Sequence, residues 1–541
     1  MKYIKNNWQE LFGVCFLILA GVKLTHGLEN LLDIQLQDET GYLGMGLNYF
    51  TSGVSAPNLG PLYSLWYYML SFICPSRIAL FYLNFKILTI AIPVLIFLFL
   101  RRYRVPILVS MIVSSYFLVF QGNLPVYPKP MHFCIMVALI FFHMAALFES
   151  ASVSTLVMIL GALACSYIRP EFFLAFMILT VVYFILLIVK RRTLTIAREL
   201  KYFGITVVLA ATTLLALGIP FSGVGSNRSF VAFAQHFTAN WLSWQKSDQS
   251  ACPNSGRIVR ENFGNAQTVF QAFYNAPFLF MRHVGYNCYL IPRNAPKIFS
   301  LHPSVSFPSG SSISYHLRLE GLFVLITFFL IVFFADSLSI AEFKWSSPRN
   351  PIFLLHLSPF ILTGLISMIV IYPRDHYLLF PAVFGVLAVL LWPRVWWIKD
   401  DEISTRMFLL AAFLILAVMP RLCVFSKIMK PNTVTINFLN SLKPVGPMTM
   451  LEAEGGFNVY LKDKYVAVPE YEKDMPFAGF MDKRKIDMIV LTDSLGNSPL
   501  FIGDPEWAAF LRNYKTQGFE DMQIPGLNTK IIFRKGAFAL N

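Results

Sequence analysis

The sequence predicts a polytopic, all-helical membrane domain followed by a small C-terminal extracytoplasmic α/β domain. Three observations predict this fold class. Of the 541 residues, 56% are hydrophobic and only 14% are charged, and the mean hydropathy is +0.59, whereas soluble globular domains are about one-quarter charged. Apolar runs, rich in the 52 phenylalanines, recur up to residue 423. After that residue the chain is more polar and shows short strand-like runs such as IDMIVL.

Eleven apolar runs are long enough, or nearly so, to cross a bilayer as helices, since a span needs about 17–25 residues. In chain order they cover residues 10–26, 78–100, 105–121, 132–148, 154–168, 172–189, 202–219, 321–342, 351–371, 377–393 and 405–423. No small-x-small cleavage pattern follows the first run, so we expect it to be a retained signal-anchor helix. The run 61–74 has only fourteen residues, and we expect it to lie as a helix at the membrane interface.

The basic residues predict the orientation of these helices. With a cytoplasmic N-terminus, fifteen of the 44 lysines and arginines lie on inner segments, including the clusters at 101–104 and 190–192. The short outer connections at 27–60, 122–131 and 372–376 hold only Lys129 and Arg374. This asymmetry follows the positive-inside rule, and it would reverse at both clusters if 61–74 crossed the membrane. We therefore expect a multi-pass protein of the inner (plasma) membrane whose C-terminal domain is extracytoplasmic.

Two larger pieces lie outside the membrane in this topology. The loop 221–320 is polar, loop-rich and basic, and the region 424–541 nearly cancels its charge with fourteen basic and thirteen acidic residues. We expect a catalytic transmembrane domain over 1–423, which includes the external loops 27–77 and 221–320, and a soluble α/β domain over 424–541. The net charge of +14 thus reflects membrane orientation together with a basic outer face, and it does not indicate a nucleic-acid partner.

The seven cysteines divide by their predicted location. Cys252 and Cys288 share the loop 221–320, and a disulfide between them is as plausible as two free thiols in an oxidising compartment. The others lie within or near apolar helices, where a thiol behaves as a small apolar group.

Adjacent carboxylates, Asp38 and Glu39, follow the first span in the sequence QDETGY, which ends in Tyr42. Such a pair is often a solvated loop or the N-cap of the next helix. The functional alternative is a general base whose neighbouring carboxylate tunes its pKa or helps to hold a divalent metal ion. Both alternatives remain open at this point.

Basic groups recur on the predicted outer face. They are Lys129, Arg169, Arg374 and His376, joined by Lys86, which lies about eight residues into the second span and can extend toward the interface. Each alone can be an ordinary cation at a helix end. Their coincidence favours a phosphate-binding set, because arginine clamps phosphate oxygens with a planar fork and lysine acts as a point charge. A carboxylate base beside such a set implies a phosphate leaving group and a hydroxyl or amine nucleophile.

The segment QDETGY resembles the Asp-Glu-x-x-Tyr segment in the first external loop of GT-C fold glycosyltransferases, most like the lipid A aminoarabinose transferases and the protein O-mannosyltransferases. NLGPLYSLWYYML at 58–70 is similar to the interfacial helix that follows there. RPE at 169–171 and PRDHYLLFP at 373–381 resemble the family's external basic turn and its Arg/Tyr-Leu-Leu-x-Pro segment. The resemblance covers roughly residues 1–390, with a different order in the last motif, where Asp375 and His376 separate Arg374 from Tyr377.

The resemblance implies an enzyme that moves a sugar, with inversion, from a polyprenyl-phosphate donor to a glycan, lipid or protein acceptor outside the membrane. Asp38 would be the general base and Glu39 would orient it. The donor phosphate would be bound by Lys86, Lys129, Arg169, Arg374 and His376. The path by which lipid and sugar enter would be lined by Tyr42, Tyr63, Tyr67 and Tyr377. No cofactor is implied with certainty, and a divalent metal ion stays open.

Three other functions compete with this interpretation. A polysaccharide ligase or polymerase would use the same lipid-linked chemistry. A lipid or sugar transporter (flippase) would keep polar residues at mid-membrane depth and often shows internal repeats, whereas here the charges gather at one face. A non-catalytic surface or assembly protein would tolerate the loss of Asp38.

Overall fold

The computed structural model describes residues 2–36, 38–51, 53–103, 105–123, 130–190, 196–221, 228–247, 249, 251–299, 305–306, 312–313, 349–391, 405–418, 430–453, 455–461 and 464–539. The chain forms two compact units, which we describe separately. The helical unit comprises Met1–His26, Gly53–Tyr63 and Lys86–Leu422. The carboxylate unit, named for Asp38 and Glu39, comprises Gly27–Ser52, Ser64–Phe85 and Cys423–Asn541.

Among the residues that the structure describes, five helices are long and apolar enough to cross a membrane, and they fit a membrane protein. Their candidate spans are Trp8–Asn30, Arg77–Arg102, Pro170–Val189, Glu199–Leu217 and Pro351–Val370. Four more apolar helices have 13–17 residues: α6 (Ile107–Val119), α7 (Pro130–Ala145), α8 (Ala151–Ser166) and α17 (Asp375–Leu391). A mostly helical chain with a small C-terminal sheet is therefore confirmed, and its apolar helices fit a membrane protein. The count of eleven spans is not, and the expected span 321–342 lies outside the described residues.

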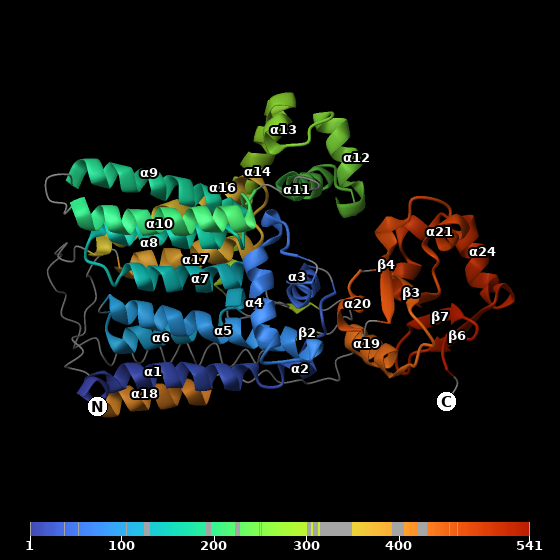
Figure 1. Ribbon diagram of the computed structural model, residues 1–541, viewed down its shortest axis with the longest axis horizontal. Coiled ribbons are helices and arrows are strands. Elements are labelled where there is room, and N and C mark those ends of the chain that lie inside the picture. Colours follow the sequence, from blue (N-terminus) through green and yellow to red (C-terminus); the bar gives the residue numbers. More distant parts are fainter. Residues whose placement is uncertain are drawn as a thin grey trace. The chain divides into compact units, whose positions relative to one another are not determined.

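The helical unit is held together by apolar helix faces. Its remaining long helices are α1 (Lys2–Thr25), α5 (Arg77–Arg102), α9 (Phe173–Lys190), α10 (Ile196–Leu217), α16 (Arg349–Val370) and α18 (Thr405–Val418). Helix α8 packs against α7, α9 and α10, while α16 packs against α9 and α17 (Figure 1). At the centre, the ring of Phe142 lies 5.3–5.7 Å from the rings of Phe353, Phe360 and Phe384. These interlocked aromatic side chains supply the packing contacts that lipid tails cannot replace.

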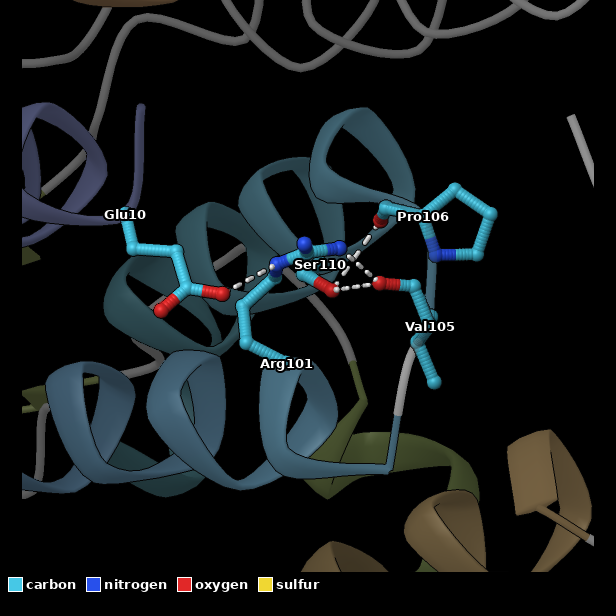
Figure 2. Close-up of polar contacts among 5 residues, drawn as sticks. All are labelled: Glu10, Arg101, Val105, Pro106 and Ser110. Carbon is cyan, nitrogen blue, oxygen red and sulfur yellow. Dashed lines mark hydrogen bonds and ion pairs between the residues drawn. The ribbon is translucent and has the colours of Figure 1, made fainter. Parts of the chain in front are cut away.

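The turn between α5 and α6 shows how one of the predicted inner clusters is used. Figure 2 shows Arg101, near the end of α5, reaching Glu10 of α1 with its Nε 3.2 Å from the carboxylate. The same guanidinium donates to the carbonyl of Val105, and the hydroxyl of Ser110 donates to the carbonyls of Val105 and Pro106 at 3.2 and 3.0 Å. Arg101 therefore fixes the helix ends in addition to its expected role in orientation.

The segment between α10 and α16 is mostly helical where the structure describes it, in contrast to the expected loop-rich character. It contains α11 (Arg228–Trp244), α12 (Ala251–Phe263), α13 (Val269–Asn275), α14 (Pro277–Ile298) and the two-residue strands β1 (Val305–Ser306) and β2 (Ser312–Ile313). Phe233, Phe237, Ile258, Phe263 and Phe280 form its own core. The helices form because apolar residues recur at spacings of three and four, and this periodicity outweighs the polar average composition.

The carboxylate unit joins two segments of the first 85 residues, Gly27–Ser52 and Ser64–Phe85, to the C-terminal domain. Helix α4 (Pro61–Ser71) begins in the helical unit and continues here; its 11 residues are too few for a span. The other helices are α2 (Leu28–Leu31), α3 (Asp38–Leu47), α19 (Pro431–Ser441), α20 (Phe457–Tyr460), α21 (Phe477–Arg484), α22 (Asp493–Gly496), α23 (Pro499–Ile502) and α24 (Pro505–Asn513). The sequence analysis expected a division at residues 423 and 424, whereas the contacts of α3 and α5 with the C-terminal residues place Gly27–Ser52 and Ser64–Phe85 in this unit.

The C-terminal sheet has the strand order β4-β3-β5-β7-β6 (Figure 1). Strands β3 (Met448–Glu452), β4 (Tyr465–Pro469) and β5 (Met488–Leu491) are parallel, and β7 (Lys530–Arg534) is antiparallel to β5 and to β6 (Phe519–Gln523). The rings of Phe477, Trp507 and Phe510 pack over one face of this sheet. The expected α/β domain, with strands near 486–491 and 530–534, is thereby confirmed.

Candidate functional site

The two adjacent carboxylates occupy the first turn of α3 and have different environments. Acidic side chains are favourable there because the helix dipole places partial positive charge at the N-terminus. Asp38 is exposed and, among the described residues, its side chain has no hydrogen-bond or ion-pair partner. Glu39 is only 1% exposed. Successive residues on a helix point about 100° apart, so one carboxylate faces solvent and the other faces the core.

Glu39 is held by a network from α3, α4 and the start of α5. The hydroxyl of Tyr67 donates to Oε1 of Glu39, and Nδ2 of Asn84 lies 3.2 Å from the same oxygen and 2.8 Å from the Tyr67 hydroxyl. Nε1 of Trp66 donates to Oδ1 of Asn84 at 2.8 Å, which fixes the amide with its Nδ2 toward Glu39. A buried carboxylate requires such donors, because an unpaired charge away from water is strongly unfavourable.

A glycine permits the close approach of α3 and α4 that this network requires. A Cβ atom at Gly46 would lie 2.6 Å from Cβ of Tyr67 and 2.7 Å from the backbone oxygen of Ser64. Real Cβ atoms do not approach other heavy atoms so closely. The absence of a side chain at Gly46 therefore lets α4 present Tyr67 to Glu39.

The C-terminal domain contacts the residue after Glu39. Oγ1 of Thr40 lies 2.8 Å from the hydroxyl of Tyr460, at the end of α20. Burial raises the pKa of Tyr460, so the phenol stays protonated. A second contact joins Arg77, at the start of α5, to the carbonyls of Val459 and Leu461 at 3.0 and 2.8 Å. Helix α20 is thus fixed to both α3 and α5.

Asp33 provides a further connection, which the sequence analysis did not single out. Its carboxylate accepts hydrogen bonds from the backbone N–H groups of Asn432 and Thr433 at 2.7 and 2.9 Å, and from the Thr433 hydroxyl at 2.6 Å. Asp33 therefore caps the N-terminus of α19 from about 400 residues away. Burial raises the pKa of Asp33, while these hydrogen bonds oppose that shift.

The predicted phosphate-binding residues lie in the helical unit, and two of the arginines there differ in their contacts. Arg169 forms an ion pair of 2.9 Å with Glu171, and its guanidinium lies 4.7 Å from the ring of Tyr377. Arg374 is exposed and forms no ion pair with any described residue. An ion pair already compensates the charge of Arg169, so Arg374 is the more available cation for a phosphate.

The other predicted cations are less informative. Lys86 lies half-buried on α5, and His376 has its ring 4.4 Å from that of Tyr377. Lys129 lies outside the described residues. Tyr372, just before α17, contacts a histidine that the sequence analysis did not single out. The ring of His236 stacks on the ring of Tyr372 with their centroids 5.0 Å apart. Burial, followed by the charge of Arg374, lowers the pKa of His236 to about 3.

The four tyrosines predicted to line a path for lipid and sugar are all buried. Tyr63 and Tyr67 have no exposed surface, and Tyr42 and Tyr377 are also buried. Tyr63 packs against the ring of Phe133 at 5.3 Å. Tyr67 donates a hydrogen bond to Glu39, and the lining of a path for lipid and sugar by the four tyrosines stays a prediction.

Two further expectations were a disulfide between Cys252 and Cys288 and a divalent metal ion at Asp38 and Glu39. Cys288 is a free, exposed thiol, so no disulfide forms at this residue in the structure; the side chain of Cys252 lies outside the described residues. Among the residues that the structure describes, no group of three or more histidine, cysteine or acidic side chains could hold a metal ion. Asp38 and Glu39 therefore have no third such ligand within this part of the chain.

Asn84 is the most informative residue that sequence reasoning missed. Its signal was an amide within the apolar run FYLNFKILT, where a polar side chain is expected to have a specific partner. In the resulting arrangement Asp38 is exposed on the first turn of α3, and the buried, hydrogen-bonded Glu39 fixes that turn in place. Such a pair is suited to accept a proton from a hydroxyl group.

No protein-family model matches the chain, and a search of curated proteins finds no match.

Proposed function

We propose that this chain is an integral-membrane glycosyltransferase that uses a polyprenyl-phosphate sugar and acts on the extracytoplasmic face. The observation that carries the proposal is the contrast between exposed Asp38 and buried Glu39 on the first turn of α3. An exposed carboxylate can meet an acceptor, while Tyr67 and Asn84 hold its neighbour still. The resemblance of QDETGY to the first external loop of GT-C enzymes supports the same assignment.

The proposed reaction is a single displacement. Asp38 takes the proton of the acceptor hydroxyl as its oxygen attacks the anomeric carbon, and the bond from that carbon to the phosphate oxygen breaks. The electron pair leaves with the polyprenyl phosphate, so attack and departure on opposite faces give inversion. Arg374 is assigned to the departing phosphate, because it is exposed and is not paired with a described carboxylate. Glu39 positions α3 and does not itself take the proton.

The test compares Asp38→Asn and Glu39→Gln with the control Asp493→Asn. Asp493 is a suitable control because it is exposed in the first turn of another helix, α22. Each variant is expressed in a deletion strain, and mass spectrometry measures lipid-linked sugars and surface glycans. We expect Asp38→Asn to abolish glycan modification and to raise the lipid-linked sugar pool, while Asp493→Asn restores the wild-type pattern. Wild-type glycans with Asp38→Asn would refute the assignment of the base.

The phosphate assignment has its own test in the same strain. Arg374→Gln is expected to lower turnover more than Arg169→Gln does, because Glu171 already neutralises Arg169. Replacement of Arg374, which is exposed and has no described carboxylate partner, should change the free energy of unfolding of the protein only slightly. If both variants lose activity only in proportion to their loss of melting temperature, the proposed role of Arg374 would be contradicted.

A further inference from the structure

Helices α13 and α14 expose a set of large apolar side chains that the proposed function does not use. Phe278 is 92% exposed, Tyr274 78% and Phe270 75%, and Met281 and Tyr289 are also exposed. We call these five residues the aromatic face. Single exposed apolar residues are ordinary, but five of them on two consecutive helices indicate a surface that another body covers.

Helix α14 is amphipathic, with a buried side opposite this face. His283 and Asn287 have no exposed surface and Leu290 is buried, whereas Met281 and Tyr289 point to the other side of the helix. Met281 and Tyr289 follow Phe278 by three and eleven residues, and at about 100° per residue the three side chains lie within an arc of about 80° on one face of the helix. The buried side thus fixes which side chains remain exposed.

The buried side of α14 is attached to the end of a candidate span. Nε2 of His283 lies 3.2 Å from the carbonyl oxygens of Val370 and Ile371, and Nδ2 of Asn287 donates to the carbonyl of Ile369 at 2.9 Å. Asn240 of α11 donates to Nδ1 of His283 at 2.9 Å, so the ring carries its proton on Nε2. The apolar stretch of α16 ends at Val370. Helix α14 therefore crosses the end of α16, where a hydrocarbon layer would give way to headgroups.

The charge of this region complements an anionic surface. Between residues 269 and 298 the chain carries Arg282, Arg293 and Lys297 and no acidic residue. Arg282 and Arg293 are exposed, and the Arg282 guanidinium lies 4.3 Å from the ring of Trp244. Basic groups beside exposed aromatic rings are typical of helices that lie in the membrane interface, where the rings enter the acyl boundary and the cations meet phosphate groups.

We propose that α13 and α14 bind the bilayer surface, with the aromatic face inserted at the interface and Arg282 and Arg293 contacting anionic phospholipid headgroups. The occupant is thus a lipid surface and not a protein partner. This surface is independent of the carboxylate chemistry, so its failure would leave the proposed transferase activity unaffected. Membrane binding by α13 and α14 would give the segment between α10 and α16 a function that its polar average composition does not indicate.

Photo-crosslinking in the full-length protein tests the proposal without removing native cysteines. The photoreactive residue p-benzoylphenylalanine replaces Tyr274 or Phe278, and Tyr471 is the matched control because it is a 72% exposed tyrosine in the C-terminal domain. The protein is placed in nanodiscs of phosphatidylcholine and phosphatidylglycerol, irradiated, and analysed by mass spectrometry. We expect lipid adducts several-fold more often at positions 274 and 278 than at 471. Equal adduct frequencies, or adducts mainly to protein, would overturn the proposal.

A second measurement addresses the headgroup charge. The double variant Arg282→Gln, Arg293→Gln should leave crosslinking to phosphatidylcholine in place but remove the preference for phosphatidylglycerol at position 278. An unchanged preference for phosphatidylglycerol would refute the role of the two arginines. The conservative variant Arg282→Lys, Arg293→Lys should retain that preference, because a bilayer surface attracts either cation.

Discussion

Substitution of Gly46 by alanine should separate α3 from α4 and loosen the support of Glu39. A Cβ atom at this position would lie 2.6 Å from Cβ of Tyr67 and 2.7 Å from the oxygen of Ser64, about 1 Å closer than ordinary contacts between packed atoms. Neither neighbouring atom is the end of a flexible side chain, so the helices must move apart. Overpacking of this kind costs about 1–3 kcal/mol.

Gly41 is the matched control, since it lies on the same helix and a Cβ atom there would meet nothing within 4 Å. Alanine favours a helix interior over glycine by about 1 kcal/mol, so Gly41→Ala should stabilise the protein slightly. Gly46→Ala gains the same helical preference but also introduces the steric conflict. The two variants should therefore differ by about 1–3 kcal/mol in the free energy of unfolding, with Gly46→Ala the less stable.

The assay is thermal unfolding of the detergent-solubilised protein, together with hydrogen exchange of the α3 backbone amides. Exchange is expected to rise in α3 for Gly46→Ala and to stay at the wild-type level for Gly41→Ala. If both variants melt at the same temperature and protect α3 equally, the close approach of α3 and α4 does not support Glu39 and the reasoning is refuted.

Three further predictions concern the supports around α3 and a buried histidine pair. Tyr460→Phe should lower the free energy of unfolding by about 1 kcal/mol, since it removes the hydrogen bond to Thr40; an unchanged melting temperature would argue against it. Asp33→Ala should cost about 1–2 kcal/mol as a lost N-cap, read out as faster amide exchange at the start of α19. Burial lowers the pKa of His236 to about 3 and of His283 to about 4, so both bind protons more readily when unfolded. Stability should therefore be full above about pH 6.5 and fall toward pH 4, by up to about 1.4 kcal/mol per pH unit for each histidine; a flat melting temperature over this range would contradict the burial of both rings.

The sequence was most informative where one local pattern decides the structure. The long apolar runs predict α5, α9, α10 and α16, and the strand-like runs near 486–491 and 530–534 predict β5 and β7. It was least informative for 228–299, because the helices there bury aromatic residues at spacings of three and four within a polar average composition. Amphipathic helices of this kind are found by their periodicity and not by their mean hydropathy.

The candidate site was predictable in its residue types but not in their division of roles. Nothing in the letters of QDETGY distinguishes Asp38 from Glu39, because only the packing of α3 on α4 decides which carboxylate is buried. The partner of Asp33 is about 400 residues away in the chain, and no local pattern predicts a contact of that separation. Asn84 was detectable as an amide in an apolar run, but its partner Glu39 was not.

These contacts make the C-terminal domain a support for the helix that carries the two carboxylates. The domain supplies Tyr460 to the residue after Glu39, and the N-terminus of its helix α19 to the carboxylate of Asp33. Loss of the domain would therefore remove contacts on which α3 depends. The hydrogen bonds of Arg77 to the C-terminal end of α20 extend the same support to the start of α5, which also carries Asn84. The C-terminal domain and the segments Gly27–Ser52 and Ser64–Phe85 therefore form one structural unit, and the geometry of Asp38 depends on residues from both ends of the chain.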